Sequence, residues 1–237
     1  MTFRPIVLLN ADRRCIVAID EFQQILKYAD ANVEASLRTH VQYCSNANFI
    51  FSGSHRHLME SMFTSPARPF YQSVTIYNLN PIPCEKYTEF CCNHFSRELK
   101  ELQPQVVENI YERFEGATFY MQRVMNTLFM RTQVGGKCIL KDIDDAINYI
   151  IDFTSATYED LLYQLPEKQS LVLQAISREG KAEKVTSGAF MRKHHLPSVS
   201  SVSSAVKGLL ERDLITQNKG IYQVYDKFLD LYLQRNR

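Results

Sequence analysis

The sequence predicts an α/β unit, then an all-helical unit and then a winged helix-turn-helix, along 237 residues. Three observations support this fold class. Short apolar runs rich in β-branched residues alternate with helical patterns over residues 1–80, which is typical of a parallel sheet. Residues 81–157 show helical periodicity with little strand signal. Residues 158–237 place three helical segments before two short strands, which is the order of a winged helix. These three ranges are the predicted domains.

In the first predicted domain, apolar runs indicate buried strands, and apolar positions that recur every three or four residues indicate helices. The segment with Pro66 and Pro69 must be a loop, because a residue that precedes proline avoids helical backbone. The predicted elements are a strand at 14–20, a helix at 21–44, a strand at 48–52, a helix at 57–63 and a strand at 73–77.

The other two predicted domains are mostly helical. In the second, helices are expected at 85–102, 105–114, 118–131 and 140–155. The third is expected to contain helices at 167–178, 187–194 and 198–212, strands at 214–217 and 221–225 joined by a turn at Asn218-Lys219-Gly220, and a last helix at 228–235.

The composition is that of an ordinary globular protein, with 45% hydrophobic and 22% charged residues. The longest apolar runs are far too short to span a bilayer, so no membrane partner is expected. Arg4, Asp12 and Arg13 lie too close to the first apolar stretch for a signal peptide. Six cysteines without an export signal are expected to be reduced thiols, which points to a cytoplasmic protein.

The formal net charge of +1 hides an asymmetry along the chain. Residues 164–237 hold 12 Lys+Arg and 7 Asp+Glu, a balance of +5, which leaves −4 for residues 1–163. A mildly acidic front and a basic tail indicate two units with different partners.

Two carboxylates follow the first predicted strand, in the segment IVAIDEFQ. Asp20 and Glu21 are expected at the carboxyl edge of a parallel sheet, where α/β proteins bind ligands. In a nucleotide hydrolase the Asp would hold Mg²⁺, usually through water, and the Glu could polarise the attacking water. The alternative is that the two acids only cap the following helix, which its dipole favours.

The second predicted strand, in the segment FIFSGS, ends in small polar groups. A hydroxyl of Ser52 or Ser54 could orient a lytic water or touch a γ-phosphate. The alternative is a Ser-Gly-Ser turn that caps the next helix. Together with the acid pair, these serines make a more specific pattern than either segment alone.

Taken together, IVAIDEFQ, NFIFSGSHRHLME and FYQSVTIYNLNPI resemble the archaeal-type AAA-related (STAND) P-loop ATPases. The tail VYDKFLDLY is similar to the strand, Asp and aromatic helix that close the winged domain in that family. The resemblance implies a partial parallel P-loop-type (AAA-like) sheet, a helical lid and a C-terminal winged helix, with ATP and Mg²⁺ as cofactors. It makes Asp20 the Mg²⁺ residue of Walker B, Glu21 the catalytic acid, and Ser52 or Ser54 the sensor-1 group.

The sequence departs from that family in three places. It contains no G-x-x-x-x-G-K-S/T, so it is expected to be an amino-terminally truncated form that cannot hydrolyse ATP alone. The segment PFYQS lacks the Arg that relatives carry before the third strand, and Arg68 is a displaced candidate for contact with a phosphate. The Gly-x-Pro of the lid corresponds to Gly116-Ala117-Thr118, which makes Gly116 the candidate nucleotide contact.

The winged helix offers a second functional surface, either for DNA phosphates or for packing on protein. Its candidate contacts are Arg192, Lys193, Ser200, Ser203, Lys207 and Lys219. The whole sequence is therefore interpreted as part of an ATP- and Mg²⁺-dependent molecular switch that binds a protein partner or itself. The alternative is a non-catalytic winged-helix module that binds DNA or protein.

Overall fold

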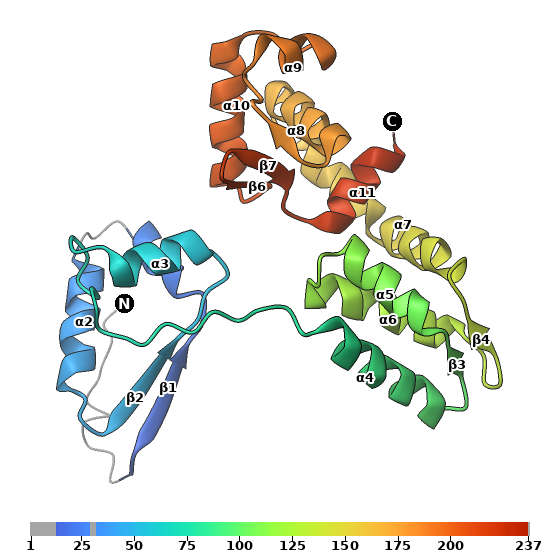
Figure 1. Cartoon of the computed structure of the whole chain (residues 1–237). Coiled ribbons are helices and arrows are strands. Elements are labelled where there is room, and N and C mark those ends of the chain that lie inside the picture. Colours follow the sequence, from blue (N-terminus) through green and yellow to red (C-terminus); the bar gives the residue numbers. More distant parts are fainter. Residues whose placement is uncertain (1–12, 29–31, 237) are drawn as a thin grey trace. The chain divides into compact units, whose positions relative to one another are not determined.

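The computed structural model describes residues 13–28 and 32–236 (Figure 1). The chain divides into two compact units between Leu79 and Asn80. The segment before this division contains two parallel strands, and the segment after it is dominated by helices.

The first unit is built on the parallel strands β1 (Cys15–Ile19) and β2 (Ala47–Phe51), with Cys15 opposite Ala47 and Ile19 opposite Phe51. Parallel neighbours need a crossover between them, and here helix α2 lies in that connection. Both strands were predicted from their apolar runs, and both are confirmed. The remaining elements are the 3₁₀ helix η1 (Phe22–Lys27), α2 (Val33–Tyr43) and α3 (Arg56–Thr64).

The core of the first unit is aromatic and lies on one face of the sheet. Phe22, Met62, Phe63 and Phe70 are buried together, and the rings of Phe22 and Phe51 are centred 4.3 Å apart. Because side chains alternate across a strand, the opposite face carries Ile16 and Ile50, which are 73% and 54% exposed. Parallel sheets are normally covered on both faces. The first unit therefore presents an apolar sheet face that its described residues leave open.

The continuous helix expected at 21–44 is wrong. Helix η1 ends at Lys27 because the backbone of Tyr28 is extended, with φ −69° and ψ 137°. Helix α2 then begins at Val33, and residues 29–31 lie outside the described residues. The apolar spacing is helical in both pieces, so periodicity alone did not reveal the interruption.

The third strand expected at 73–77 is also wrong. This segment contains no strand, and the side chains of Val74, Ile76 and Tyr77 are exposed. A β-branched sequence becomes a strand only when a neighbour supplies hydrogen bonds, and the pairing seen in the first unit joins β1 to β2 alone within the described residues.

The second unit begins with helices packed around two very short strands. Helix α4 ends at Arg97, earlier than expected, because Leu99 adopts a left-handed backbone with φ 54°. Helix α7 runs past its expected end and through residue 157. The elements are α4 (Cys84–Arg97), β3 (Glu101–Leu102), α5 (Pro104–Arg113), α6 (Thr118–Arg131), β4 (Lys137–Cys138) and α7 (Asp142–Tyr163). We refer to α4–α7 as the helical half.

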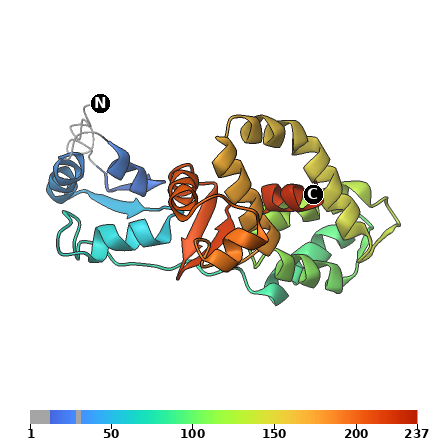
Figure 2. The ribbon, with the colours of Figure 1, turned by 90° about the horizontal axis from the view of Figure 1, so that it is seen from above.

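The rest of the second unit has the predicted order of helices followed by a β-hairpin, and we refer to it as the winged half (Figure 2). Lys219 and Gly220 both have positive φ, which suits the tight turn between two twisted strands. The short β5 completes a sheet of order β5-β7-β6. The elements are α8 (Glu167–Glu179), β5 (Ala182–Glu183), α9 (Gly188–Lys193), α10 (Val199–Glu211), β6 (Ile215–Asn218), β7 (Ile221–Val224) and α11 (Lys227–Arg235).

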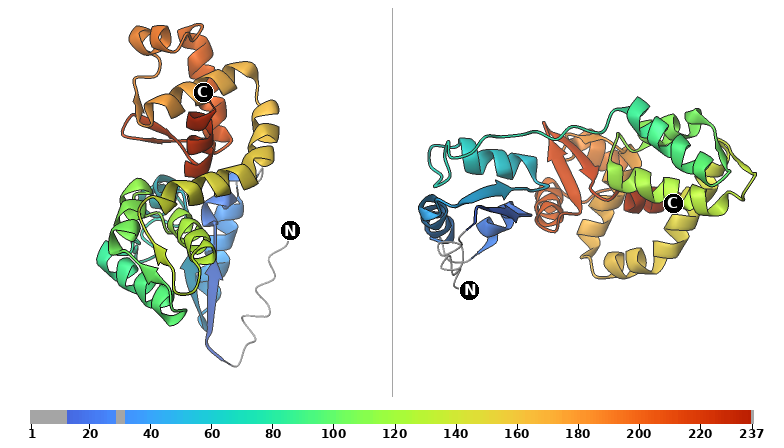
Figure 3. Two further views of the ribbon diagram at one scale, coloured as in Figure 1. Left: turned by 90° about the vertical axis from the view of Figure 1, so that its right-hand side faces the viewer. Right: turned by 90° about the horizontal axis from the view of Figure 1, so that it is seen from below.

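One hydrophobic cluster runs through both halves of the second unit. It joins Ile110 and Met121 of the helical half to Ile176, Leu209 and Leu229 of the winged half. Helix α11 packs against α7 and α8, and the orange and red winged half can be followed in two further views in Figure 3. The described helices include none that is both long enough and apolar enough to cross a membrane.

Candidate functional site

The carboxyl ends of β1 and β2 bring together the four side chains that we call the acid edge: Asp20, Glu21, Ser52 and Ser54. The backbone continues the pairing beyond both strands, because Ser52 N–H donates to the carbonyl of Ile19 at 3.0 Å and Phe22 N–H donates to that of Ser52 at 2.9 Å. These bonds hold the two strand ends in fixed register. The edge therefore forms from two apolar strands that each stop at a polar residue, as the sequence predicts.

Asp20 is held by the hydroxyl of Ser52. Ser52 Oγ donates to Asp20 Oδ1 at 2.6 Å, and the same oxygen accepts from the backbone N–H of Glu21 at 2.9 Å. These hydrogen bonds, that of Ser52 first, lower the pKa of Asp20, since they stabilise its charged form. Asp20 is therefore ionised at neutral pH, as a residue that attracts a cation must be.

Glu21 is held by a different pair of donors. Ser54 Oγ donates to Glu21 Oε2 at 3.1 Å, and Gln23 Nε2 donates to the same oxygen at 2.5 Å. The side chain of Glu21 makes no capping bond to η1, although Glu21 occupies the N-cap position. Both carboxylates thus bond to hydroxyls of the second strand end, which is more than a helix cap requires.

Arg68 pairs with Glu34 of α2, at 3.1 Å between Arg68 Nη1 and Glu34 Oε2. Glu34 is buried, and burial raises its pKa even though the arginine opposes that change. The contact that the structure gives Arg68 is therefore an ion pair that ties α2 to the loop after α3. A phosphate-binding role for Arg68 stays a prediction.

Gly116 has a structural reason to be glycine. Its φ is +71°, and a Cβ there would lie 2.7 Å from Pro81 Cβ and 3.0 Å from the hydroxyl of Tyr111. Both the backbone conformation and the close packing exclude a larger residue. Contact between Gly116 and a nucleotide stays a prediction.

The candidate contacts of the winged half are exposed, but two of the lysines are engaged in ion pairs. Lys193 Nζ lies 2.6 Å from Glu179 Oε1, and Lys207 Nζ lies 3.8 Å from Glu211 Oε1. Arg192, Lys193, Ser200, Ser203 and Lys219 are exposed, as is Lys207. The surface is therefore accessible, with part of its charge already neutralised.

Glu115 is a charged contact that the sequence analysis missed, and it joins the two halves of the second unit. Its carboxylate accepts from Lys181 Nζ at 2.8 Å and from Lys227 Nζ at 2.7 Å. These two bonds lower the pKa of Glu115 to about 2. Neither lysine is near Glu115 in the sequence, so no local signal could have revealed the contact.

Replacing Glu115 with Gln should destabilise the second unit by about 1 kcal/mol at pH 7, because an exposed ion pair is weakened by solvent. The carboxylate contributes above its ordinary pKa of 4.5, and this contribution is lost as the pH falls toward about 2. The difference in unfolding free energy between wild type and Glu115→Gln should therefore shrink below pH 4.5. Urea titrations from pH 3 to 7 would measure it, with the exposed Glu112→Gln as control. A difference that stays constant with pH would contradict the prediction.

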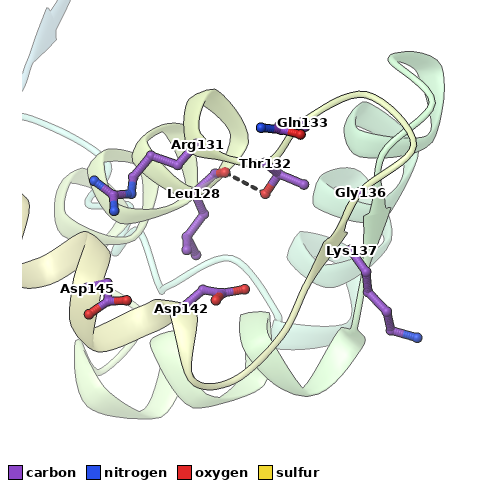
Figure 4. A pocket seen from close by; sticks show the side chains of 8 residues that line it. All are labelled: Leu128, Arg131, Thr132, Gln133, Gly136, Lys137, Asp142 and Asp145. Carbon is purple, nitrogen blue, oxygen red and sulfur yellow. Dashed lines mark hydrogen bonds between the residues drawn. The ribbon is translucent and has the colours of Figure 1, made fainter.

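A depression of about 300 Å³ lies in the helical half, between the end of α6 and the start of α7 (Figure 4). Several of its polar groups already have partners: Thr132 Oγ1 donates to the carbonyl of Leu128 at 2.8 Å, and Asp142 Oδ2 accepts from Ile139 N–H at 2.8 Å. Lys137 points away and pairs with Glu101. The acid edge remains the better candidate because its acids and hydroxyls converge. The lining residues are Leu128, Arg131, Thr132, Gln133, Gly136, Lys137, Asp142 and Asp145.

The fold thus combines a small α/β unit, which carries the acid edge, with a second unit that ends in a winged helix. A family model described as a probable winged helix domain matches residues 156–235. This match confirms the winged helix that the element order predicted. No curated protein matches the chain.

Over most of its length the chain is similar in fold to a solved ATPase structure. It is similar to the Walker-type ATPase of Pyrococcus abyssi, with a TM-score of 0.62 and 16% identity, over 93% of this chain and 63% of that one. The chain thus spans less than two thirds of that relative, and at this identity the likeness shows the fold alone.

Two further solved structures resemble the chain with TM-scores below 0.5, too low to add to the argument. The ORC2 protein of Aeropyrum pernix has a TM-score of 0.49 and 13% identity, over 98% of this chain and 68% of that one. A RuvB variant of Thermotoga maritima has a TM-score of 0.48 and 15% identity, over 94% and 70%.

Proposed function

We propose that the chain is the part of a STAND-type AAA ATPase that runs from Walker B to the winged helix, and that the complete site works as an ATP- and Mg²⁺-dependent switch in the cytoplasm. The observation that carries this proposal is the pairing of two acids with two hydroxyls across adjacent parallel strand ends. Asp20 bonds to Ser52, and Glu21 bonds to Ser54. Such an edge is where open α/β sheets bind ligands.

In this proposal each side chain of the acid edge has one task. Asp20 is ionised and exposed, and it holds Mg²⁺ through water, as suits a cation that keeps most of its hydration shell. Bound Mg²⁺ would neutralise charge on the phosphates. Glu21 orients and polarises the attacking water, while Ser52 and Ser54 fix the two acids.

The proposed site needs a P-loop, which this sequence does not contain. Among the described residues, nothing in the first unit covers the sheet face around Ile16 and Ile50, and no strand pairs with the segment at 73–77. Parallel sheets are normally covered on both faces, so this supports a sheet that is completed by a further strand and helix. A protein partner or a second copy of the chain would then complete the sheet, and the chain alone would not hydrolyse ATP.

Cation binding tests the role of Asp20 directly in this chain. Mn²⁺ can replace Mg²⁺ in a titration followed by electron paramagnetic resonance, and Asp20→Asn should weaken its binding at least about tenfold, because the ionised oxygen is lost. Asp160→Asn, at an exposed position of α7, is the matched control. Equal Mn²⁺ affinity in wild type and Asp20→Asn would contradict the assignment.

ATP hydrolysis tests the role of Glu21. The chain alone should not hydrolyse ATP. A longer protein, in which a segment with a P-loop is fused to the amino end of this chain, should hydrolyse it. In that form Glu21→Gln should lower kcat by about 100-fold or more, since positioned general bases contribute factors of this size. Turnover by the chain alone would overturn the claim that a P-loop from elsewhere is needed. Turnover unaffected by Glu21→Gln would overturn the role of Glu21.

A second candidate function is DNA binding by the winged half, favoured by its exposed Arg192 and Lys219 and by its basic balance of +5. Fluorescence anisotropy with duplex DNA should then show affinity that falls steeply with salt. Arg192→Ala should reduce the slope of log K against log salt by about 1, whereas Lys141→Ala in the helical half should not. Undetectable binding at low salt would favour protein packing instead.

A further inference from the structure

We propose that Gln23 is a positioning residue that holds the Glu21 carboxylate and the Ser54 hydroxyl together. In this proposal Gly53 has no side chain because the Gln23 amide packs against it. Gln23 closes the segment IVAIDEFQ and Gly53 is the centre of the Ser-Gly-Ser turn, but neither is among the candidate site residues named above. The inference rests on the proposed function only where it treats Glu21 as the acid that orients water. The hydrogen-bonded unit itself depends on no nucleotide.

The first observation is the burial of an amide next to an exposed acid. Gln23 is 2% exposed, although it lies two residues after Glu21 at the rim of the sheet. Its Nε2 donates to Glu21 Oε2 at 2.5 Å and to Ser54 Oγ at 3.4 Å. A buried polar group is costly unless it is bonded. These two bonds satisfy the Nε2 end of the amide, while its Oε1 has no hydrogen-bond partner among the described residues.

The second observation concerns Gly53, whose backbone shows no positive φ. A Cβ built on Gly53 would lie 2.1 Å from Gln23 Oε1 and 2.7 Å from Met59 Sδ. The glycine between Ser52 and Ser54 is therefore explained by close approach of the Gln23 amide. In the Ser-Gly-Ser turn, Ser52 thus bonds to Asp20 and Ser54 bonds to Glu21. Gly53 leaves room for Gln23, which also bonds to Glu21.

The third observation is the backbone of Glu21, which is left-handed at φ 48° and ψ 40°. A residue with a side chain needs local contacts to hold this conformation, which Leu99 and Lys219 also adopt at a helix end and in a turn. The bond from Glu21 N–H to Asp20 Oδ1 and the bonds that Gln23 and Ser54 make to Oε2 supply that support.

The two carboxylates are thus held by different side chains. Ser52 holds Asp20, while Gln23 and Ser54 hold Glu21 by a single oxygen. Glu21 Oε2 thus accepts two hydrogen bonds, which fix the orientation of the carboxylate. In this proposal Oε1 is the oxygen that contacts a ligand. Loss of Gln23 should thus free the side chain of Glu21 and leave that of Asp20 unchanged.

Nuclear magnetic resonance of the full chain tests the contact first. The side-chain amide of Gln23 should exchange with solvent at least about tenfold more slowly than that of Gln24, its exposed neighbour. Glu21→Gln, a surface change, should shift the Gln23 amide resonances because the charged acceptor is lost, and Asp20→Asn should not. A Gln23 amide that exchanges as fast as that of Gln24, or that responds equally to both variants, would overturn the proposal.

Side-chain couplings test the positioning role. In wild type Glu21 should occupy one χ1 rotamer, and in Gln23→Met, which keeps the volume but removes the donor, it should average over several while Asp20 keeps its own. Gln24→Met is the matched control. A single Glu21 rotamer in Gln23→Met refutes positioning. If Gln23→Met does not fold, the Glu21→Gln shift decides. Neither the amide resonances nor the Glu21 rotamer depends on nucleotide. These measurements therefore test the role of Gln23 even if the Mn²⁺ or ATP experiments contradict the proposed function.

Discussion

Phe228→Ala should lower the free energy of unfolding of the second unit by about 3–5 kcal/mol, the usual cost of removing a buried aromatic ring. Phe228 is 2% exposed and lies in the first turn of α11. Its ring centroid is 5.6 Å from that of Phe114 and 5.2 Å from that of Tyr120, and the Arg123 guanidinium lies 5.9 Å away. The substitution leaves a cavity where the helical and winged halves meet.

Phe153→Ala is the matched control for this experiment, because it removes the same side chain from the same unit. Phe153 is 77% exposed on α7, so its loss should change stability by no more than about 0.5 kcal/mol. Urea unfolding monitored by far-ultraviolet circular dichroism measures both variants. Similar effects in the two would show that the contact between the halves does not stabilise the unit.

This contact also shows which parts of the fold could be predicted from the sequence. Helix α6 was expected at 118–131 and lies there, because Met121, Val124 and Leu128 recur at helical spacing and are all buried. The hairpin β6–β7 was indicated by Asn218-Lys219-Gly220, whose turn chemistry is local. Features that depend on neighbouring residues in the sequence were therefore predicted well.

Features that depend on distant partners were not predictable in the same way. The pattern at 73–77 is that of a strand, but pairing needs a neighbour that the pattern does not specify. Glu115 bonds to Lys227 across 112 positions, a distance at which no spacing rule applies. Strands β3 and β4 are two residues each, too short to carry a periodic signal.

The acid edge lies between these cases. The positions of Asp20, Glu21, Ser52 and Ser54 could be predicted because parallel strands bring their carboxyl ends to one edge. The role of Gln23 could not, because only the structure shows that its amide turns back to Glu21 instead of facing solvent. The sequence signal for Gln23 is its place at the end of the segment IVAIDEFQ, which carries the family resemblance but does not say what the amide contacts.

Gly116→Ala is the other substitution with a large expected effect, about 2–4 kcal/mol on the second unit. The left-handed φ of +71° alone costs an L-residue roughly 1–2 kcal/mol. The new Cβ would also lie 2.7 Å from Pro81 Cβ, a separation that real side chains do not tolerate, so the loop between α5 and α6 must shift. Thermal and urea unfolding of the full chain would measure the loss.

Gly135→Ala separates the two causes. Gly135 has a similar φ of +76°, but nothing lies within 4 Å of its built Cβ, so this variant should show the backbone cost alone, about 1–2 kcal/mol. A Gly116→Ala effect no larger than that of Gly135→Ala would mean that Pro81 yields easily and that packing does not require the glycine. The left-handed backbone would then be the reason for a glycine at that position. A clearly larger effect shows that close packing against Pro81 also requires the glycine, which gives Gly116 a structural role in the helical half.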